Sequence, residues 1–294
     1  MTQSSFKARC VSTSETMTEQ AALETKSVTL AYEHNVIAKD LSVNIPHGKF
    51  TVIVGPNGCG KSTLLRSLSR LLVPKSGEIL LNGENIHSQS TREVAKKLGL
   101  LPQSAIAPDG IKVIDLVSRG RFPHQKWFQP WSEADQKAVE LAMQATGVID
   151  FAQLNVDQLS GGQRQRVWVA MALAQETSLL LLDEPTTYLD IAHQIELMDL
   201  FQDLNRIQGH TLVAVLHDLN HACRYADHLI MIKSGEIIAT GSPNDIITET
   251  LIEEVFGLSC LILPDPISHT PLIIPRGRAS TVTINEMKLK LNPH

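Results

Sequence analysis

The sequence has few cysteines, and their spacing does not form a functional set. The four cysteines lie far apart in a chain of 294 residues and include no CxxC pair. This pattern excludes a disulfide framework and a zinc site built from paired cysteines, and it is typical of a reducing compartment.

Long hydrophobic runs are also lacking. No apolar run approaches the roughly 20 residues that a membrane-spanning helix needs. Residues 1–24 are rich in Ser, Thr and Glu and contain no apolar core of a secretory signal. We therefore expect a disordered tail over residues 1–24 and a cytosolic protein that meets a membrane only through a partner. Met17 begins a second Met-Thr segment and is an alternative start.

Neither a basic excess nor a high aromatic content is present. The formal net charge is -5 and the pI is about 6.1, which argues against a general nucleic-acid binder. Aromatic residues make up only 4 %, whereas apolar residues in total make up 43 %. The composition therefore predicts a globular protein whose core is built mainly from Leu, Ile, Val and Ala.

A glycine-rich loop stands between a predicted strand and a predicted helix. Residues 50–54 form a short β-rich apolar run, and Leu64, Leu65, Leu68, Leu71 and Leu72 recur at helical spacing after the loop. This is the context that the G-x(4)-G-K-[ST] phosphate-binding pattern requires. The loop consists of Gly55, Pro56, Asn57, Gly58, Cys59, Gly60, Lys61, Ser62 and Thr63.

The residue types in this loop suit a nucleoside triphosphate. Gly58 and Gly60 let backbone N–H groups turn inward around phosphate oxygens, and the N-terminus of the following helix adds its positive dipole end. The Lys61 ammonium can bind the β- and γ-phosphates, while the Ser62 hydroxyl can ligate Mg²⁺. Cys59 occupies a position that the pattern leaves free.

A second predicted strand, residues 179–182, ends in two carboxylates. In a parallel sheet, side chains at the carboxyl end of a strand face the ligand crevice. Asp183 is therefore placed to hold Mg²⁺, and Glu184 is placed to orient and deprotonate the attacking water. On their own, adjacent carboxylates are more often a solvated strand end, and the phosphate loop is what favours catalysis.

A third predicted strand, residues 212–216, ends at His217. Its place at the same edge of the sheet suits a contact with the γ-phosphate. His217 and His221 also have the i, i+4 spacing of a zinc helix, but His217 ends a strand and no third ligand is evident.

The sequence Leu-Ser-Gly-Gly-Gln at Leu159–Gln163 resembles the signature of the ABC transporter ATPases. The resemblance covers approximately residues 25–278. It implies that Gln103 is a catalytic residue and magnesium ligand of the Q-loop. It also implies that Asp190 belongs to the D-loop, and that Tyr32, just ahead of the first strands, stacks on adenine.

The resemblance further implies a head-to-tail homodimer. Ser160, Gly161, Gly162 and Gln163 lie at the start of a helix predicted to begin near Gln163, where they form a second anion-binding helix end. In the family, this signature caps the γ-phosphate that the other copy holds. Hydrolysis of ATP is then coupled to closure of the dimer.

Within the family, Arg119–His124 resembles the importers of iron siderophores, haem and cobalamin. The matching stretches are most similar to ferric enterobactin importers, with ferric citrate importers next: Ile53–Arg66, Leu159–Arg166, Asp183–Ile191, Ala214–Asn220 and Ala222–Tyr225. Citrate, hydroxamate, haem and cobalamin cargoes stay open. A soluble ABC ATPase is disfavoured because the chain has no coiled-coil insertion or second cassette, and Arg119–His124 disfavours an exporter. An intact Glu184 and His217 disfavour an inactive scaffold.

The expected fold is an α/β P-loop ATPase core with an antiparallel β edge. We expect the ABC ATPase domain at residues 25–260, a helical subdomain inserted at about 104–158, and a C-terminal extension at 261–294. Two short helices are predicted around residues 114–117 and 139–143. The expected partners are a second copy, inner-membrane permease subunits and, indirectly, a periplasmic siderophore-binding protein, with the ATPase at the cytoplasmic face of a bacterial inner membrane.

Overall fold

The central sheet is built from strands that are buried on both faces. The computed structural model describes residues 21–33, 35–103, 106–125, 130–187 and 189–277. The six strands run in the order β10-β9-β3-β8-β7-β6, and all neighbours are parallel except β10 and β9. In chain order they are β3 (Phe50–Val54), β6 (Leu98–Leu101), β7 (Leu179–Asp183), β8 (Thr211–Val215), β9 (His228–Lys233) and β10 (Glu236–Gly241).

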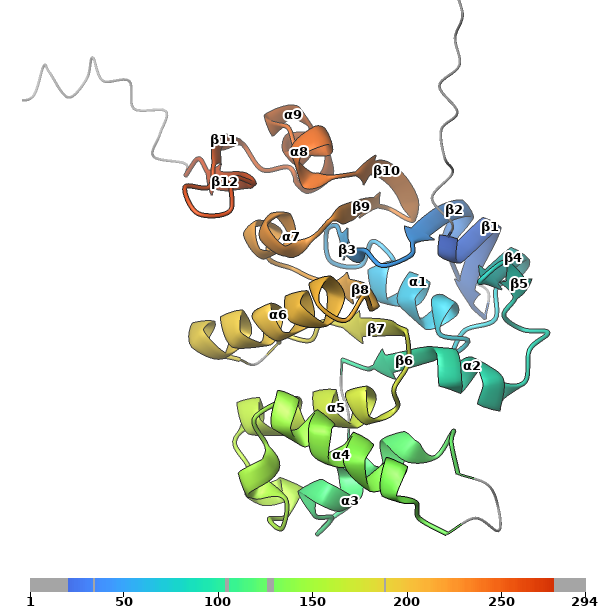
Figure 1. The fold of residues 1–294 in the computed structure, drawn as a ribbon. Helices are drawn as coiled ribbons and strands as arrows, with labels where there is room; N and C mark the ends of the chain where they lie inside the picture. Colours follow the sequence, from blue (N-terminus) through green and yellow to red (C-terminus); the bar gives the residue numbers. More distant parts are fainter. Residues whose placement is uncertain (1–20, 34, 104–105, 126–129, 188, 278–294) are drawn as a thin grey trace, which may run out of the picture.

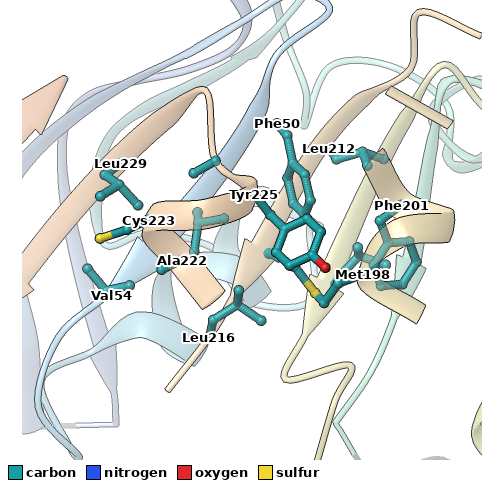
Figure 2. Packing of buried hydrophobic residues seen from close by; sticks show 14 of the residues in the cluster. Phe50, Val54, Met198, Phe201, Leu212, Leu216, Ala222, Cys223, Tyr225 and Leu229 are labelled. Carbon is teal, nitrogen blue, oxygen red and sulfur yellow. The ribbon is translucent and has the colours of Figure 1, made fainter. Parts of the chain in front are cut away.

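Alternate residues of these strands supply two hydrophobic clusters, one on each face of the sheet. On one face, Val52 of β3 and Leu180 of β7 pack against helices α6 (Ile191–Arg206) and α7 (Leu219–Tyr225). On the other, Ile53 and Leu181 pack against α1 (Lys61–Leu68). The period of two along each strand explains why a continuous apolar sequence is needed here. Figure 2 shows the first cluster, with Tyr225 of α7 near Phe50 of β3 and Phe201 of α6 near Leu212 of β8.

A second, antiparallel sheet covers α1 at the edge of the core (Figure 1). Its order is β2-β1-β4-β5, formed by β1 (Ala21–Tyr32), β2 (Asn35–Pro46), β4 (Ser76–Leu81) and β5 (Glu84–Asn85). Residues 21–24, predicted to be tail, are strand because Ala22 and Leu23 are buried and because Ala21, Leu23 and Glu24 pair with β2. Tyr32 is the last residue of β1, so its predicted place ahead of the strands was wrong. Residues 1–20 lie outside the described part.

The helical subdomain is formed around three helices at one end of the molecule (Figure 1). They are α3 (Val113–Ser118), α4 (Glu133–Ala145) and α5 (Gly161–Ala174), with 3-10 turns at Arg119–Arg121, Ile149–Phe151 and Val156–Gln158. The two predicted helices at 114–117 and 139–143 are confirmed by α3 and α4. The predicted end at residue 158 is too early, because Val167, Ala170 and Ala174 of α5 belong to the core of this subdomain.

The segment predicted as a C-terminal extension begins inside a strand. Strands β11 (Cys260–Pro264) and β12 (Pro271–Pro275) form a hairpin. Its Cys260 and Ile273 are buried in the hydrophobic cluster that α6 and α7 form with the central sheet. A boundary between residues 260 and 261 therefore divides a packed unit. The remaining helices are α2 (Thr91–Lys97), α8 (Pro243–Ile246) and α9 (Glu249–Phe256). Residues 278–294 lie outside the described part.

The predicted α/β core with an antiparallel edge and an inserted helical part is confirmed. Helix α1 is shorter than predicted: it ends at Leu68, Arg70 has a positive φ of 66°, and Leu71 is left exposed. In the part of the chain that the structure describes, no helix combines the length and apolar character needed to cross a bilayer.

A buried ion pair joins the helices of the helical subdomain. Arg121 is 4 % exposed, and its Nε lies 2.9 Å from Asp135 Oδ1. The Arg121 Nη1 donates to the Ala174 carbonyl oxygen at 2.7 Å and lies 2.6 Å from a carboxylate oxygen of the more exposed Glu176. The hydrogen bond from Ser132 is the main cause that lowers the pKa of Asp135. Ser132 and Asp135 also form the capping box at the N-terminus of α4. Arg121 thus has a structural role.

We predict that Asp135→Ala lowers the free energy of unfolding by about 3–5 kcal/mol, because it leaves the buried Arg121 charge without the carboxylate that is buried with it. The matched control is Glu176→Ala, which removes an exposed partner of the same guanidinium and should cost less than about 1 kcal/mol. Urea unfolding followed by circular dichroism measures both variants. Equal costs for the two would contradict the role given to burial.

Candidate active site

Three parallel strands bring the predicted catalytic segments to one edge of the central sheet. Val215 of β8 is paired with Ile53 of β3 on one side and with Asp183 of β7 on the other. The phosphate loop follows β3, Glu184 lies in the loop after β7, and His217 lies in the loop after β8. Residues separated by more than 100 positions in the sequence are therefore neighbours in the fold.

The phosphate loop, Glu184 and His217 line a common cavity of about 290 Å³. Its described lining consists of Ile37, Asn57, Gly58, Gly60, Lys61, Ser62, Thr63, Glu184 and His217. Ile37 of β2 was not predicted as a site residue. Its Cγ2 is the atom that a side chain at Gly60 would meet, at 3.2 Å. No sequence pattern indicates this contact, because it depends on how the antiparallel sheet folds over the loop.

The backbone of the loop requires glycine at two positions. Gly60 precedes α1 and has a φ of 106°, a backbone conformation that residues with a Cβ rarely adopt. A Cβ at Gly55 would lie 2.1 Å from the carbonyl oxygen of Ile232. The loop can therefore lie close against the end of β9 and still present its N–H groups to an anion at the start of α1.

Lys61 and Cys59 occupy the inner side of the loop. The Lys61 ammonium donates to the carbonyl oxygens of Gly55 and Pro56, each at 2.9 Å. Cys59 is 4 % exposed and belongs to the cluster around α1. Its place in the phosphate-loop pattern predicted that Cys59 is a nucleotide-binding residue. Its side chain is directed into the core, which leaves only its backbone for such a role.

Asp183 and Ser62 are in direct contact. The Ser62 hydroxyl donates to Asp183 Oδ1 at 3.0 Å, which joins the end of β7 to the start of α1. Asp183 is 4 % exposed, and burial raises the pKa of its carboxyl group; the hydrogen bond from Ser62 partly opposes this shift. A buried carboxylate beside a hydroxyl is a pair of hard oxygen ligands.

The Glu184 carboxylate lies between the other two predicted catalytic side chains, Gln103 and His217. Gln103 Nε2 donates to Glu184 Oε2 at 2.6 Å, and His217 Nε2 lies 2.5 Å from Glu184 Oε1. Thr187, which no sequence motif indicates, donates a long hydrogen bond from its hydroxyl to Glu184 Oε2 at 3.4 Å. The structure thus brings together all three residues that were predicted to be catalytic.

The backbone of Glu184 is strained. Its φ is 51°, in the left-handed region, which costs a residue with a side chain on the order of 1–3 kcal/mol. The following turn is closed by a hydrogen bond from the Thr187 N–H to the Glu184 carbonyl oxygen at 3.2 Å. Neighbouring contacts must therefore hold the orientation of the Glu184 side chain.

Tyr32 lines a second cavity of about 290 Å³ rather than the one at the phosphate loop. Gln103 and Asp183 line the same cavity, together with Leu65 and Arg66 of α1. The Tyr32 hydroxyl accepts a long hydrogen bond from Arg66 Nη1 at 3.4 Å. Both residues are exposed, so the Tyr32 ring is accessible to a planar group.

The signature residues lie at the N-terminus of α5, two residues earlier than the predicted helix start. Ser160 is the N-cap: its Oγ accepts from the Gln163 N–H, and Gln163 Oε1 accepts from the Ser160 N–H. Asp190 is the exposed N-cap of α6 and accepts hydrogen bonds from the backbone and ring of His193. Neither Asp190 nor the signature residues are among the described lining of the phosphate-loop cavity.

A larger cavity of about 590 Å³ lies elsewhere, between α4 and the end of α6. Its described lining, which includes Leu141, Leu173, Leu204 and His210, contains none of the predicted site residues. Size alone therefore does not identify the site. The convergence of a lysine, two carboxylates and a histidine does so on chemical grounds.

Comparisons with known proteins agree on one family. The family model described as ABC transporter matches residues 38–187. The ferric enterobactin transport ATP-binding protein FepC of Escherichia coli is 55 % identical over 92 % of this chain and 100 % of its own length. The achromobactin transport ATP-binding protein CbrD of Dickeya dadantii is 54 % identical over 87 % of this chain and 96 % of its own.

Solved structures show the same likeness. A transporter described as metal-chelate type, in an inward-facing conformation, has a TM-score of 0.76 at 27 % identity and covers 89 % of this chain and 99 % of its own. A dimeric ATP-binding cassette in a post-hydrolysis state, bound to ADP and Pi, has a TM-score of 0.66 at 30 % identity. It covers 75 % of this chain and 98 % of its own.

We predict that Glu184→Gln gives a stable ATP-bound dimer without turnover. The amide keeps the shape of the side chain but cannot accept a proton from water. Size-exclusion chromatography with ATP and a phosphate-release assay measure the two properties. A variant that hydrolyses ATP at the wild-type rate would refute the role of Glu184 as base.

We also predict that Asp183→Asn stabilises the protein without nucleotide at neutral pH, while ATPase activity falls at least about a hundredfold. Because burial raises the pKa of Asp183, folding favours its neutral form, and this contribution is lost as pH rises through the raised pKa. Asn keeps an oxygen acceptor for Ser62 and is never charged.

The melting temperature of each protein as a function of pH measures this effect. The advantage of Asp183→Asn should be largest near neutral pH and should disappear below the ordinary Asp pKa of about 3.9. An advantage that does not change with pH would contradict the electrostatic origin.

Proposed function

The chain belongs to the ABC transporter family, and on that premise we propose that it hydrolyses ATP to energise import of a ferric siderophore through a membrane permease. The ATPase part follows from the family and from the side chains gathered around the phosphate loop. The cargo is the finer part of the proposal. The observation that carries it is the 55 % identity with a ferric enterobactin transport protein over nearly the whole chain.

The geometry supports a division of roles within the site. Lys61 and the N–H groups before α1 bind the phosphates of ATP, and Tyr32 offers a ring for the adenine. Glu184 orients and deprotonates the attacking water, while Gln103 and His217 position the Glu184 carboxylate and contact the γ-phosphoryl group. Such fixed donors stabilise the charge that shifts as the phosphoryl group leaves.

The site also fits Mg²⁺, which the family uses with ATP. Ser62 and Asp183 place a hydroxyl and a buried carboxylate 3.0 Å apart, and the raised pKa of Asp183 marks a carboxylate that a cation would stabilise. Gln103 would supply a third oxygen. When bound, Mg²⁺ neutralises charge on the β- and γ-phosphate oxygens.

The working unit is a head-to-tail homodimer. The N-terminus of α5, with Ser160 and Gly161 exposed, is an anion-binding helix end that the cavity of its own chain does not include. In the second copy, this signature would cap the γ-phosphate held by Lys61. The similar cassette that was solved with ADP and Pi is a dimer, which supports this arrangement.

The cargo is a ferric siderophore, most closely of the enterobactin type. The names of the similar proteins refer to ferric enterobactin and to achromobactin. Two permease subunits and a periplasmic siderophore-binding protein complete the importer. The ATPase then lies at the cytoplasmic face of the inner membrane. Closure of the dimer around ATP drives the permease from one access state to the other.

We predict that deleting the gene in its source organism abolishes uptake of radiolabelled iron from a catecholate complex. Uptake from citrate, hydroxamate and haem should continue. A plasmid with the wild-type chain should restore uptake, and the matched plasmid with Glu184→Gln should not. If every iron source is still taken up in the deletion strain, the assignment of an iron cargo fails. If a different single source fails, the cargo is that chelate.

A further inference from the structure

A glutamine on the signature helix binds the loop that carries the candidate base. Gln165 lies on α5, one turn after Gly162, and its Nε2 donates to the carbonyl oxygen of Pro185 at 3.0 Å. Pro185 directly follows Glu184 and is buried. The signature helix and the catalytic carboxylate of the same chain are thus joined by one hydrogen bond.

This bond acts on a strained part of the backbone. Glu184 is held at a φ of 51°, and such a conformation persists only where surrounding contacts determine it. The Gln165 amide fixes the peptide between Pro185 and Thr186, one residue beyond Glu184. A second glutamine, Gln194 of α6, donates to the carbonyl oxygens of Leu189 at 3.0 Å and Thr186 at 3.4 Å. Two helices therefore hold the same turn.

Only one of these helices carries the signature. Ser160 is the N-cap of α5, and Gly162 lies close to the D-loop, where an added Cβ would be 3.4 Å from Leu189 Cδ2. The N-cap of α6 is Asp190, which is outside the signature. Gln165 therefore connects the signature helix directly to Pro185, whereas Gln194 holds Thr186 and Leu189 from α6.

We propose that Gln165 is a positioning residue that links the two ATP sites of the dimer. This inference rests on the proposed function, because it needs a signature that contacts the nucleotide of the second copy. When the signature of one chain engages that nucleotide, Gln165 sets the orientation of Glu184 in the site of its own chain. Each base is then aligned by the occupancy of the opposite site, and hydrolysis becomes cooperative in ATP.

The test compares Gln165→Met with Gln194→Met in the purified full-length protein. Methionine keeps the length and helix propensity of glutamine and removes only its polar end. For Gln165→Met we expect kcat to fall by about tenfold to a hundredfold, the effect of a misplaced catalytic group. The Hill coefficient for ATP should fall below the wild-type value. Gln194→Met should lower kcat and keep the wild-type Hill coefficient.

Binding of a fluorescent ATP analogue to each protein separates positioning from nucleotide affinity, and its Kd should stay within about twofold of wild type. Equal Hill coefficients in the wild type and Gln165→Met would overturn the proposal, as would a Kd that rises in parallel with the loss of kcat. If Gln165→Met does not fold, Gln165→Ala is used with the same expectations. A wild-type protein that hydrolyses no ATP would overturn the proposed function itself, whereas variant effects overturn only this inference.

Discussion

The parallel register of β3, β8 and β7 is the constraint on which the site depends. Because Val215 is paired with both Ile53 and Asp183, the loops after these strands leave the sheet at the same level. The phosphate loop, Glu184 and His217 therefore line one cavity. A shift of one residue in one strand would also move its alternating side chains to the wrong face of the sheet, so the two hydrophobic clusters protect the geometry of the site.

The lysine and the two carboxylates of the site each have a hydrogen-bond partner within the protein. The Lys61 ammonium is bonded to loop carbonyls, the Asp183 carboxylate to Ser62, and the Glu184 carboxylate to Gln103. These bonds hold the side chains in place around the cavity. A site that is ordered before its ligand arrives reduces the entropy that binding must offset.

Local patterns predict what depends on local chemistry. The strand at 50–54, the glycines of the loop and the carboxylates after residue 182 follow from steric and electrostatic requirements that neighbouring residues reveal. Contacts across the fold do not: the Gln103–Glu184 bond spans 81 positions, and Ile37 reaches the loop from another sheet. The motif Arg119–His124 was interpreted through its resemblance to importers, but the structure shows that its Arg121 forms a buried ion pair. The sequence does not reveal this role, because the partners of Arg121 lie on α4 and at the end of α5.

Helix α5 explains how the two parts of the molecule can act on each other. Its Val169 and Ala172 pack in the cluster of the central sheet, and its Val167 and Ala170 pack in the helical subdomain. A helix buried on two sides cannot move with one part and leave the other unaffected, because close-packed interiors transmit displacement. Any force on the helical subdomain must therefore change the position of α5 against the sheet. The signature at its N-terminus and Gln165, which contacts the loop of the candidate base, belong to this same helix.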